Sequence, residues 1–154
     1  MTPMSRVVAA CLIGLSTIAI AACGDDEKFA LHRVPLASGV QVREQRYDCI
    51  EPTLCARYVI LEGQAAESAG ELLGREAAAL RQGGWTVVRD GGAYPTVDAT
   101  SPDRRSYLTL STAAATVREF SRRGVHWNDD LNARLHSLAG SGAPALAGTL
   151  GPPG

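Results

Sequence analysis

The sequence YVILEGQAAESAGELLGREAAALRQGGWTVV, residues 58–88, contains the pattern that decides the fold. Tyr58 to Leu61 is a short continuous apolar run rich in β-branched and aromatic residues, which is typical of a strand covered on both faces. Ser68 and Glu71 have the spacing of a capping box, so a helix is expected to begin there. Apolar residues on one face then recur at helical intervals, at Ala69, Leu72, Leu73, Ala77 and Leu80.

The end of this helix and the segment after it indicate a β-helix-β unit. Gly83 and Gly84 supply the residue type that tolerates left-handed backbone angles at a helix C-terminus. Trp85 to Val88 follows as a second strand, and its start places Trp85 over the helix end. If the two strands share a sheet, the connection between them should be right-handed.

Beyond this unit the sequence predicts one more strand and two more helices. Residues 90–104 are rich in Gly, Pro, Asp and Ser and are interpreted as a long connection. Residues 106–111 alternate polar with apolar side chains, which favours a strand with one buried face. Residues 113–123 are expected to be helical, and Asn128 is expected to cap a last helix that ends at Gly140.

The order of these elements predicts a small α+β domain over residues 47–140. Its expected architecture is a three-stranded sheet with packed helices, β-α-β-β-α-α, which is partly ferredoxin-like in connectivity. Val40 and Val42 alternate with polar neighbours and allow a short edge strand before the domain. Residues 141–154 contain only Gly, Ala, Pro, Ser, Thr and Leu and are interpreted as a disordered tail.

The beginning of the chain has the features of an export signal. Arg6 is followed by an uncharged, largely apolar run, Val7 to Ala22, which ends in Ile20-Ala21-Ala22-Cys23 and is followed by acidic residues. The run is shorter than the about 20 apolar residues that a spanning helix needs. An aliphatic residue, two small residues and a cysteine after such a run resemble the lipobox signal peptide of bacterial lipoproteins.

The resemblance implies how the chain is processed and where it lies. Residues 1–22 would be removed as a signal peptide, Cys23 would be lipidated, and residues 23–46 would form a lipidated N-terminus and flexible tether. The protein would then be anchored to the outer face of the cytoplasmic membrane. A similar pattern ends at Cys11, but the apolar run before it is too short for a signal. By composition the remainder resembles small uncharacterised lipoproteins of actinobacteria.

Cys49 and Cys55 are predicted to form a disulfide bond. The resemblance implies an exported chain, and the two cysteines flank Pro52, which favours a turn. Cys11 would leave with the signal peptide and Cys23 would be blocked by lipid, so these two would be each other's partners. The alternative is a redox or metal site, but the pair lacks CxxC spacing and a neighbouring histidine.

Charge and polar side chains indicate neither nucleic-acid binding nor catalysis. The 16 acidic residues slightly outnumber the 15 basic ones, and no cofactor or metal site is apparent at His32, His126 or His136. An envelope hydrolase using His126 with Asp129 or Asp130 lacks a nucleophile elbow, and helix capping is the alternative interpretation of both aspartates.

Two pairs of neighbouring arginines, Arg104-Arg105 and Arg122-Arg123, are compatible with attraction to an acidic lipid or polymer. The alternative interpretation of both pairs is an ordinary solvated surface.

The candidate residues for ligand contact are Trp85, Tyr94 and Trp127, which would form a stacking platform; core packing is the alternative interpretation. The first functional hypothesis is a non-enzymatic binding or accessory module that contacts an envelope protein. The second is a small-molecule or glycan carrier using Trp85 and Tyr94, and an envelope hydrolase ranks third. A closed apolar pocket of at least about 300 Å³ would favour the carrier, whereas a flat exposed apolar patch would favour the protein partner.

Overall fold

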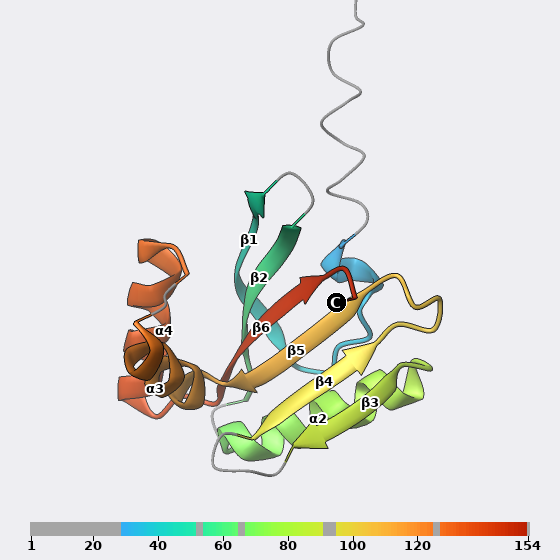
Figure 1. The fold of residues 1–154 in the computed structure, drawn as a ribbon. Helices are drawn as coiled ribbons and strands as arrows, with labels where there is room; N and C mark the ends of the chain where they lie inside the picture. The colour runs from blue at the N-terminus through green and yellow to red at the C-terminus, as the bar shows by residue number, and fades with distance from the viewer. Residues whose placement is uncertain (1–28, 52–53, 65–66, 91–94, 125–126, 154) are drawn as a thin grey trace, which may run out of the picture.

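The computed structural model describes residues 29–51, 54–64, 67–90, 95–124 and 127–153, and these form one six-stranded antiparallel sheet with helices on both faces (Figure 1). The elements in chain order are the 3-10 helix η1 (Leu31–Arg33), β1 (Gln41–Glu51), β2 (Leu54–Glu62), α2 (Ala69–Gln82), β3 (Thr86–Asp90), β4 (Thr96–Thr100), β5 (Tyr107–Thr112), α3 (Ala113–Arg123), α4 (Asp129–Ser141) and β6 (Ala145–Gly151). The strand order is β1-β2-β6-β5-β4-β3.

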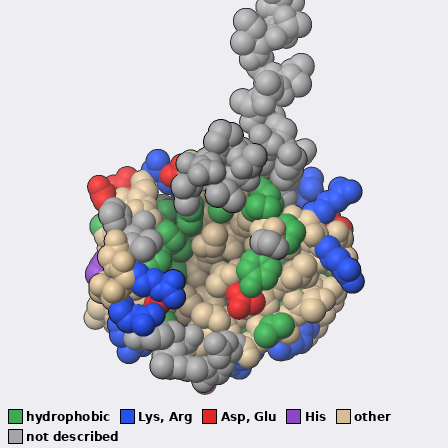
Figure 2. Space-filling model, viewed as in Figure 1, with side chains coloured by type: hydrophobic (Ala, Val, Ile, Leu, Met, Phe, Trp, Pro, Cys, Tyr) green, Lys and Arg blue, Asp and Glu red, His purple; other side chains and the backbone are tan. Residues whose placement is uncertain are grey.

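The two faces of the sheet are covered by different helices. On one face α2 packs over the sheet, and its Leu72 and Leu80 share a buried cluster with Leu110 of β5. On the other face α3 and α4 lie side by side, and Leu135 of α4 shares a second cluster with Ile60 of β2. α3 packs against β5 and β6 and α4 packs against β6, and part of this face of the molecule is hollowed, as Figure 2 shows.

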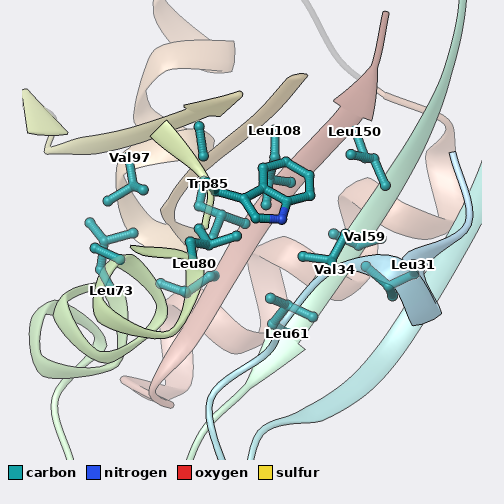
Figure 3. Close-up of a cluster of buried hydrophobic side chains, with 14 of the residues drawn as sticks. Leu31, Val34, Val59, Leu61, Leu73, Leu80, Trp85, Val97, Leu108 and Leu150 are labelled. Atoms are coloured by element: carbon teal, nitrogen blue, oxygen red, sulfur yellow. The ribbon is translucent and has the colours of Figure 1, made fainter. Parts of the chain in front are cut away.

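Trp85 lies at the centre of the larger core cluster (Figure 3). Leu80 of α2 lies on one side of the indole ring, and Leu31 and Val34 of the N-terminal segment lie on the other. Leu31 and Val34 are only 9% and 6% exposed, so the segment before β1 is part of the folded domain.

The elements expected between residues 58 and 88 are confirmed. The Ser68 hydroxyl accepts a hydrogen bond from the Glu71 N–H (3.2 Å), and the Glu71 carboxylate accepts one from the Ser68 N–H (2.7 Å), so the capping box is present. β2 and β3 belong to one sheet, but β6, β5 and β4 lie between them. The helix therefore crosses several strands rather than joining neighbours.

The expected three-stranded sheet and its partly ferredoxin-like connectivity are wrong, although the α+β class is retained. β2, β3 and β5 correspond to the three expected strands, and β1, β4 and β6 are additional. β4 lies inside residues 90–104, the segment interpreted as a long connection. Val97 and Ala99 of β4 are buried while their neighbours are partly exposed, so this is a strand with one buried face.

The disordered tail expected over residues 141–154 is also wrong, because β6 lies between β2 and β5 near the middle of the sheet. The small side chains of β6 reflect close packing. A Cβ atom added to Gly148 would lie 2.6 Å from Leu110 Cδ2 and 2.9 Å from Val59 Cγ2. Glycine is therefore required at this position of β6, where side chains of the two neighbouring strands leave no room for a Cβ atom.

The boundary between tether and domain lies earlier than the expected 23–46 and 47–140 limits. Residues from Phe29 onward pack into the core, and β1 begins at Gln41. β1 is an edge strand, as Val40 and Val42 suggested, but it runs to Glu51. The apolar residues of this segment have no regular period, so the sequence pattern did not reveal their burial.

The disulfide bond between Cys49 and Cys55 is confirmed. The two residues lie directly opposite each other on β1 and β2, and their Cα atoms are 3.9 Å apart. The bond therefore links the two strands of a hairpin, with the expected turn residue Pro52 outside the described residues.

Candidate functional site

A cavity of about 1070 Å³ opens at the end of the sheet where β4 and β6 finish and β3 and β5 begin. Its walls come from the N-terminal segment around η1, from β1 and β2, from the β4–β5 loop, and from residues that follow β6. Figure 1 shows η1 beside the C-terminal end of the chain. The cavity therefore brings together segments from both ends of the described sequence.

Apolar side chains form the floor of this cavity. Phe29, Val34, Trp85 and Leu150 line it, and each is less than a tenth exposed. All four belong to the larger core cluster, so the floor is the surface of a packed core. Such a floor favours the apolar part of a ligand.

The β4–β5 loop, residues 101–106, forms a polar wall held by its own hydrogen bonds. The Asp103 carboxylate accepts from the Ser101 hydroxyl (2.6 Å) and from the Arg105 N–H (3.0 Å). The Ser101 hydroxyl oxygen accepts from the Ser106 N–H at 2.9 Å. The hydrogen bond from Ser101 is the main cause that lowers the pKa of Asp103. The loop thus has a defined shape, and the Asp103 carboxyl within it favours its ionised form.

Positive charge predominates on the rim of the cavity. Arg33, Arg104 and Arg105 line it and are exposed, whereas Asp103 is the one acidic side chain among the lining residues described. Arg104 has a φ of 57°, a left-handed backbone angle that is uncommon outside glycine. Figure 2 shows basic side chains at the edge of the molecule where the β4–β5 loop lies.

Two contacts with Arg57 support the wall nearest the N-terminus. Arg57 Nε donates a hydrogen bond to the Phe29 carbonyl oxygen at 2.8 Å. Its guanidinium carbon also lies 5.7 Å from the ring centre of Tyr47, which lines the cavity. β2 therefore helps position two of the residues that enclose the site.

A buried acid on α2 holds the next part of the N-terminal segment. Glu76 is 0% exposed, and its carboxyl oxygens accept from the Ala37 N–H at 3.2 and 3.4 Å. Burial raises the pKa of Glu76 to about 7. Arg75 donates to the Ser38 carbonyl oxygen (2.9 Å) and to the Glu67 carboxylate (2.7 Å).

The sequence candidates for ligand contact do not form one platform. Trp85 lines the cavity, on the α2 side of the sheet. Trp127 packs on the other side, 5.0 Å from Tyr58 and 5.6 Å from Phe120 between ring centres. Tyr94 lies outside the described residues. A shared stacking surface of both tryptophans is therefore wrong, and Trp85 is the candidate that the cavity retains.

The residues considered for catalysis are dispersed or undescribed. His32 and His136 are exposed on η1 and α4, and His126 lies outside the described residues. Asp129 and Asp130 occupy the first turn of α4, whose cap is the Asn128 side chain. Within the described ranges, no group of three or more His, Cys, Asp or Glu side chains is placed to hold a metal ion.

The sequence did not reveal the cavity itself. The pair Arg104-Arg105 was visible as a basic doublet, but its place in the same cavity as Arg33 depends on the path of the whole N-terminal segment. Pro152 and Pro153 line the same cavity, although the tail to which they belong was expected to be disordered. They reach the cavity because they directly follow β6, which ends at Gly151.

Comparisons with known proteins give no match. A scan against protein-family models finds no matching family, and searches of curated proteins and of solved structures find no similar chain. In the part of the chain that the structure describes, no helix combines the length and apolar character needed to cross a membrane. The functional argument therefore rests on the cavity and on the residues around it.

Proposed function

We propose that the protein is a membrane-tethered binding lipoprotein that holds an amphipathic small molecule in the cavity beside Trp85. The observation that carries this proposal is the cavity of about 1070 Å³, whose floor is apolar and whose rim is polar and charged. Ligand sites typically span about 300–1000 Å³ and combine apolar walls with a few polar groups. The proposal corresponds to the small-molecule carrier and not to the accessory module that contacts an envelope protein.

An accessory module that docks a protein through an apolar face has less support. Among the described residues, the exposed large hydrophobic side chains are Val42 and Val88, at 40% and 64%. They lie on β1 and β3, the two opposite edges of the sheet. Two separated side chains do not make the contiguous apolar patch that marks a protein-docking surface.

The lipid anchor is part of the same proposal. The lipobox and Cys23 lie outside the described residues, so the support comes from the sequence pattern. The Cys49–Cys55 disulfide is consistent with export to an oxidising compartment. Labelled palmitate should be incorporated into the wild-type protein and not into a Cys23→Ser variant; equal labelling of both would contradict lipidation at this residue.

Binding can be measured with N-phenyl-1-naphthylamine, an uncharged apolar fluorophore that brightens on leaving water. A chain spanning residues 24–154, without the acylated cysteine, avoids detergent, which would itself bind the probe. We expect saturable enhancement at one probe per protein. Ser106→Trp should abolish it, because Ser106 lines the cavity and the new indole would occupy that space.

The neighbouring variant Tyr107→Trp is the matched control. Tyr107 follows Ser106 and is the first residue of β5, and alternation along the strand directs its side chain away from the face on which Leu108 is buried. It should bind the probe as wild type does. Non-saturable enhancement, or equal loss in both variants while circular dichroism shows both folded, would refute a binding cavity at this end of the sheet.

A further inference from the structure

We propose that the natural occupant of the cavity is an anionic phospholipid of the membrane to which the protein is tethered, with its phosphate bound by Arg33, Arg104 and Arg105. This proposal rests on the binding function above and adds the chemical class of the ligand. Its observation is the juxtaposition of an arginine rim with an apolar floor in one cavity.

The charge of the rim favours an anion. Three arginines and one aspartate line the cavity, and the aspartate already accepts hydrogen bonds from the Ser101 hydroxyl and from the Arg105 backbone N–H within the loop. No ion pair found among the described residues involves Arg33 or Arg104. Guanidinium groups bind phosphate through paired, charge-assisted hydrogen bonds, so a phosphate diester matches the unmet donors.

The loop that carries two of these arginines is preorganised. Five hydrogen bonds within residues 101–106 join its backbone and side chains, including Ser101 N–H to the Ser106 carbonyl (2.9 Å) and Arg104 N–H to the Ser101 carbonyl (2.9 Å). Arg104 keeps its left-handed backbone angle inside this network. Arginines on a defined loop lose less conformational freedom when they bind an anion.

The apolar floor matches the acyl part of the same ligand. Phe29, Trp85 and Leu150 line the cavity beneath the rim, and of the three Phe29 and Trp85 keep some exposed hydrocarbon, at 9% and 7% against 1% for Leu150. A free phosphate ion or a sugar phosphate would leave that surface in contact with water, whereas an acyl chain would cover it. A ligand with one anionic end and one apolar end uses both parts of the site.

The tether limits how far this cavity lies from the bilayer. Phe29 lines the cavity and follows Cys23 by six residues, and six extended residues span at most about 20 Å. Acyl chains on Cys23 would therefore keep Phe29, and with it the cavity mouth, within about 20 Å of the membrane surface. Membrane lipid is the amphiphile present at highest local concentration at that distance.

Quenching of Trp85 by brominated lipid tests the proposal on the full acylated chain. The Trp127→Phe background leaves Trp85 as the one tryptophan, since the sequence has two. The protein is reconstituted in phosphatidylcholine vesicles that contain acyl-brominated phosphatidylglycerol or, at equal mole fraction, acyl-brominated phosphatidylcholine. We expect half-maximal quenching at about a tenfold lower mole fraction of the brominated phosphatidylglycerol.

A charge-matched pair of variants separates the rim from general surface attraction. Arg33→Gln/Arg104→Gln should lose the preference for phosphatidylglycerol. Arg118→Gln/Arg134→Gln, which removes the same charge from α3 and α4 on the other face, should keep it. Equal quenching by both lipids, or equal loss of preference in both double variants, would overturn the proposal.

Two further measurements identify the source of the phosphate and separate the two proposals. Inorganic phosphate, compared with chloride at equal ionic strength, should compete only weakly with phosphatidylglycerol, because it lacks the acyl chain that would cover the apolar floor; if it abolishes the quenching, the acyl part adds nothing to binding and the lipid assignment is wrong. Binding of N-phenyl-1-naphthylamine that is blocked by Ser106→Trp, together with equal quenching by both lipids, would overturn the lipid class alone. If the wild-type cavity shows no saturable binding of N-phenyl-1-naphthylamine, the proposed function itself is wrong.

Discussion

Replacing Glu76 with glutamine should remove a pH dependence of folding stability that this buried acid imposes. Glu76 is fully buried on α2, and burial raises its pKa from 4.5 to about 7. The charged groups that act on it are Arg75, which favours the ionised form, and Glu67, which opposes it. The Ala37 N–H donates to its carboxyl oxygens, so the same side chain holds the N-terminal segment.

The sign and size of the effect follow from the two pKa values. Between pH 4.5 and 7 the folded protein retains a proton on Glu76 that the unfolded chain has lost. The free energy of unfolding therefore falls as the pH rises through this window, and it levels off above pH 7. A separation of this size corresponds to a loss of about 3 kcal/mol at most. Glutamine carries no ionisable proton, so Glu76→Gln should lack this slope.

Urea denaturation across that pH range measures the difference directly. Subtracting the two proteins at each pH cancels the contributions of other carboxyl groups, because only the slope due to Glu76 differs. Glu119→Gln is the matched control, since arginine contacts lower the pKa of Glu119 and its removal should leave the slope between pH 4.5 and 7 intact. Parallel profiles for wild type and Glu76→Gln would show that Glu76 does not titrate in this window.

Three other changes test the packing of the fold. Gly148→Ala should lower the free energy of unfolding by about 1–3 kcal/mol, because the new Cβ would meet core side chains at 2.6 and 2.9 Å. Gly140→Ala, on the open surface of α4, is the control and should be neutral or stabilising. Equal effects of the two substitutions would refute close packing at β6. Cys49→Ser/Cys55→Ser should cost about 2 kcal/mol, and the same loss should follow from adding reductant to the wild-type protein but not to this variant. Leu135→Ala, in the smaller core cluster, should cost about 2–5 kcal/mol by urea denaturation, and a loss below 1 kcal/mol would contradict its burial.

Local patterns predicted the elements whose side chains repeat with a clear period. The capping box and apolar face of α2, the alternation of β5 and the Asn128 cap of α4 all have their expected places. β6 was missed because its signal depends on tertiary packing. In the sequence Gly148 is typical of a turn or a tail, and only the structure shows that Leu110 and Val59 leave no room for a side chain there. A run of small residues is therefore compatible with two structures, a crowded strand in the middle of a sheet and a flexible tail, and composition alone does not distinguish them.

The cavity was unpredictable for a related reason, because one of its walls is the N-terminal segment, which packs onto the domain without a periodic sequence pattern. Phe29 has no periodic neighbours, yet it lines the site and its carbonyl accepts from Arg57. Glu76 accepts a hydrogen bond from the Ala37 N–H eight residues further along, so contacts from β2 and α2 hold the N-terminal segment at two points, one in the cavity wall and one beyond it. The segment that would lead to the proposed membrane anchor is therefore also a wall of the cavity. Any displacement of that wall alters the distance between Arg33 and the β4–β5 loop, so the proposed anion binding depends on how this segment packs against the domain.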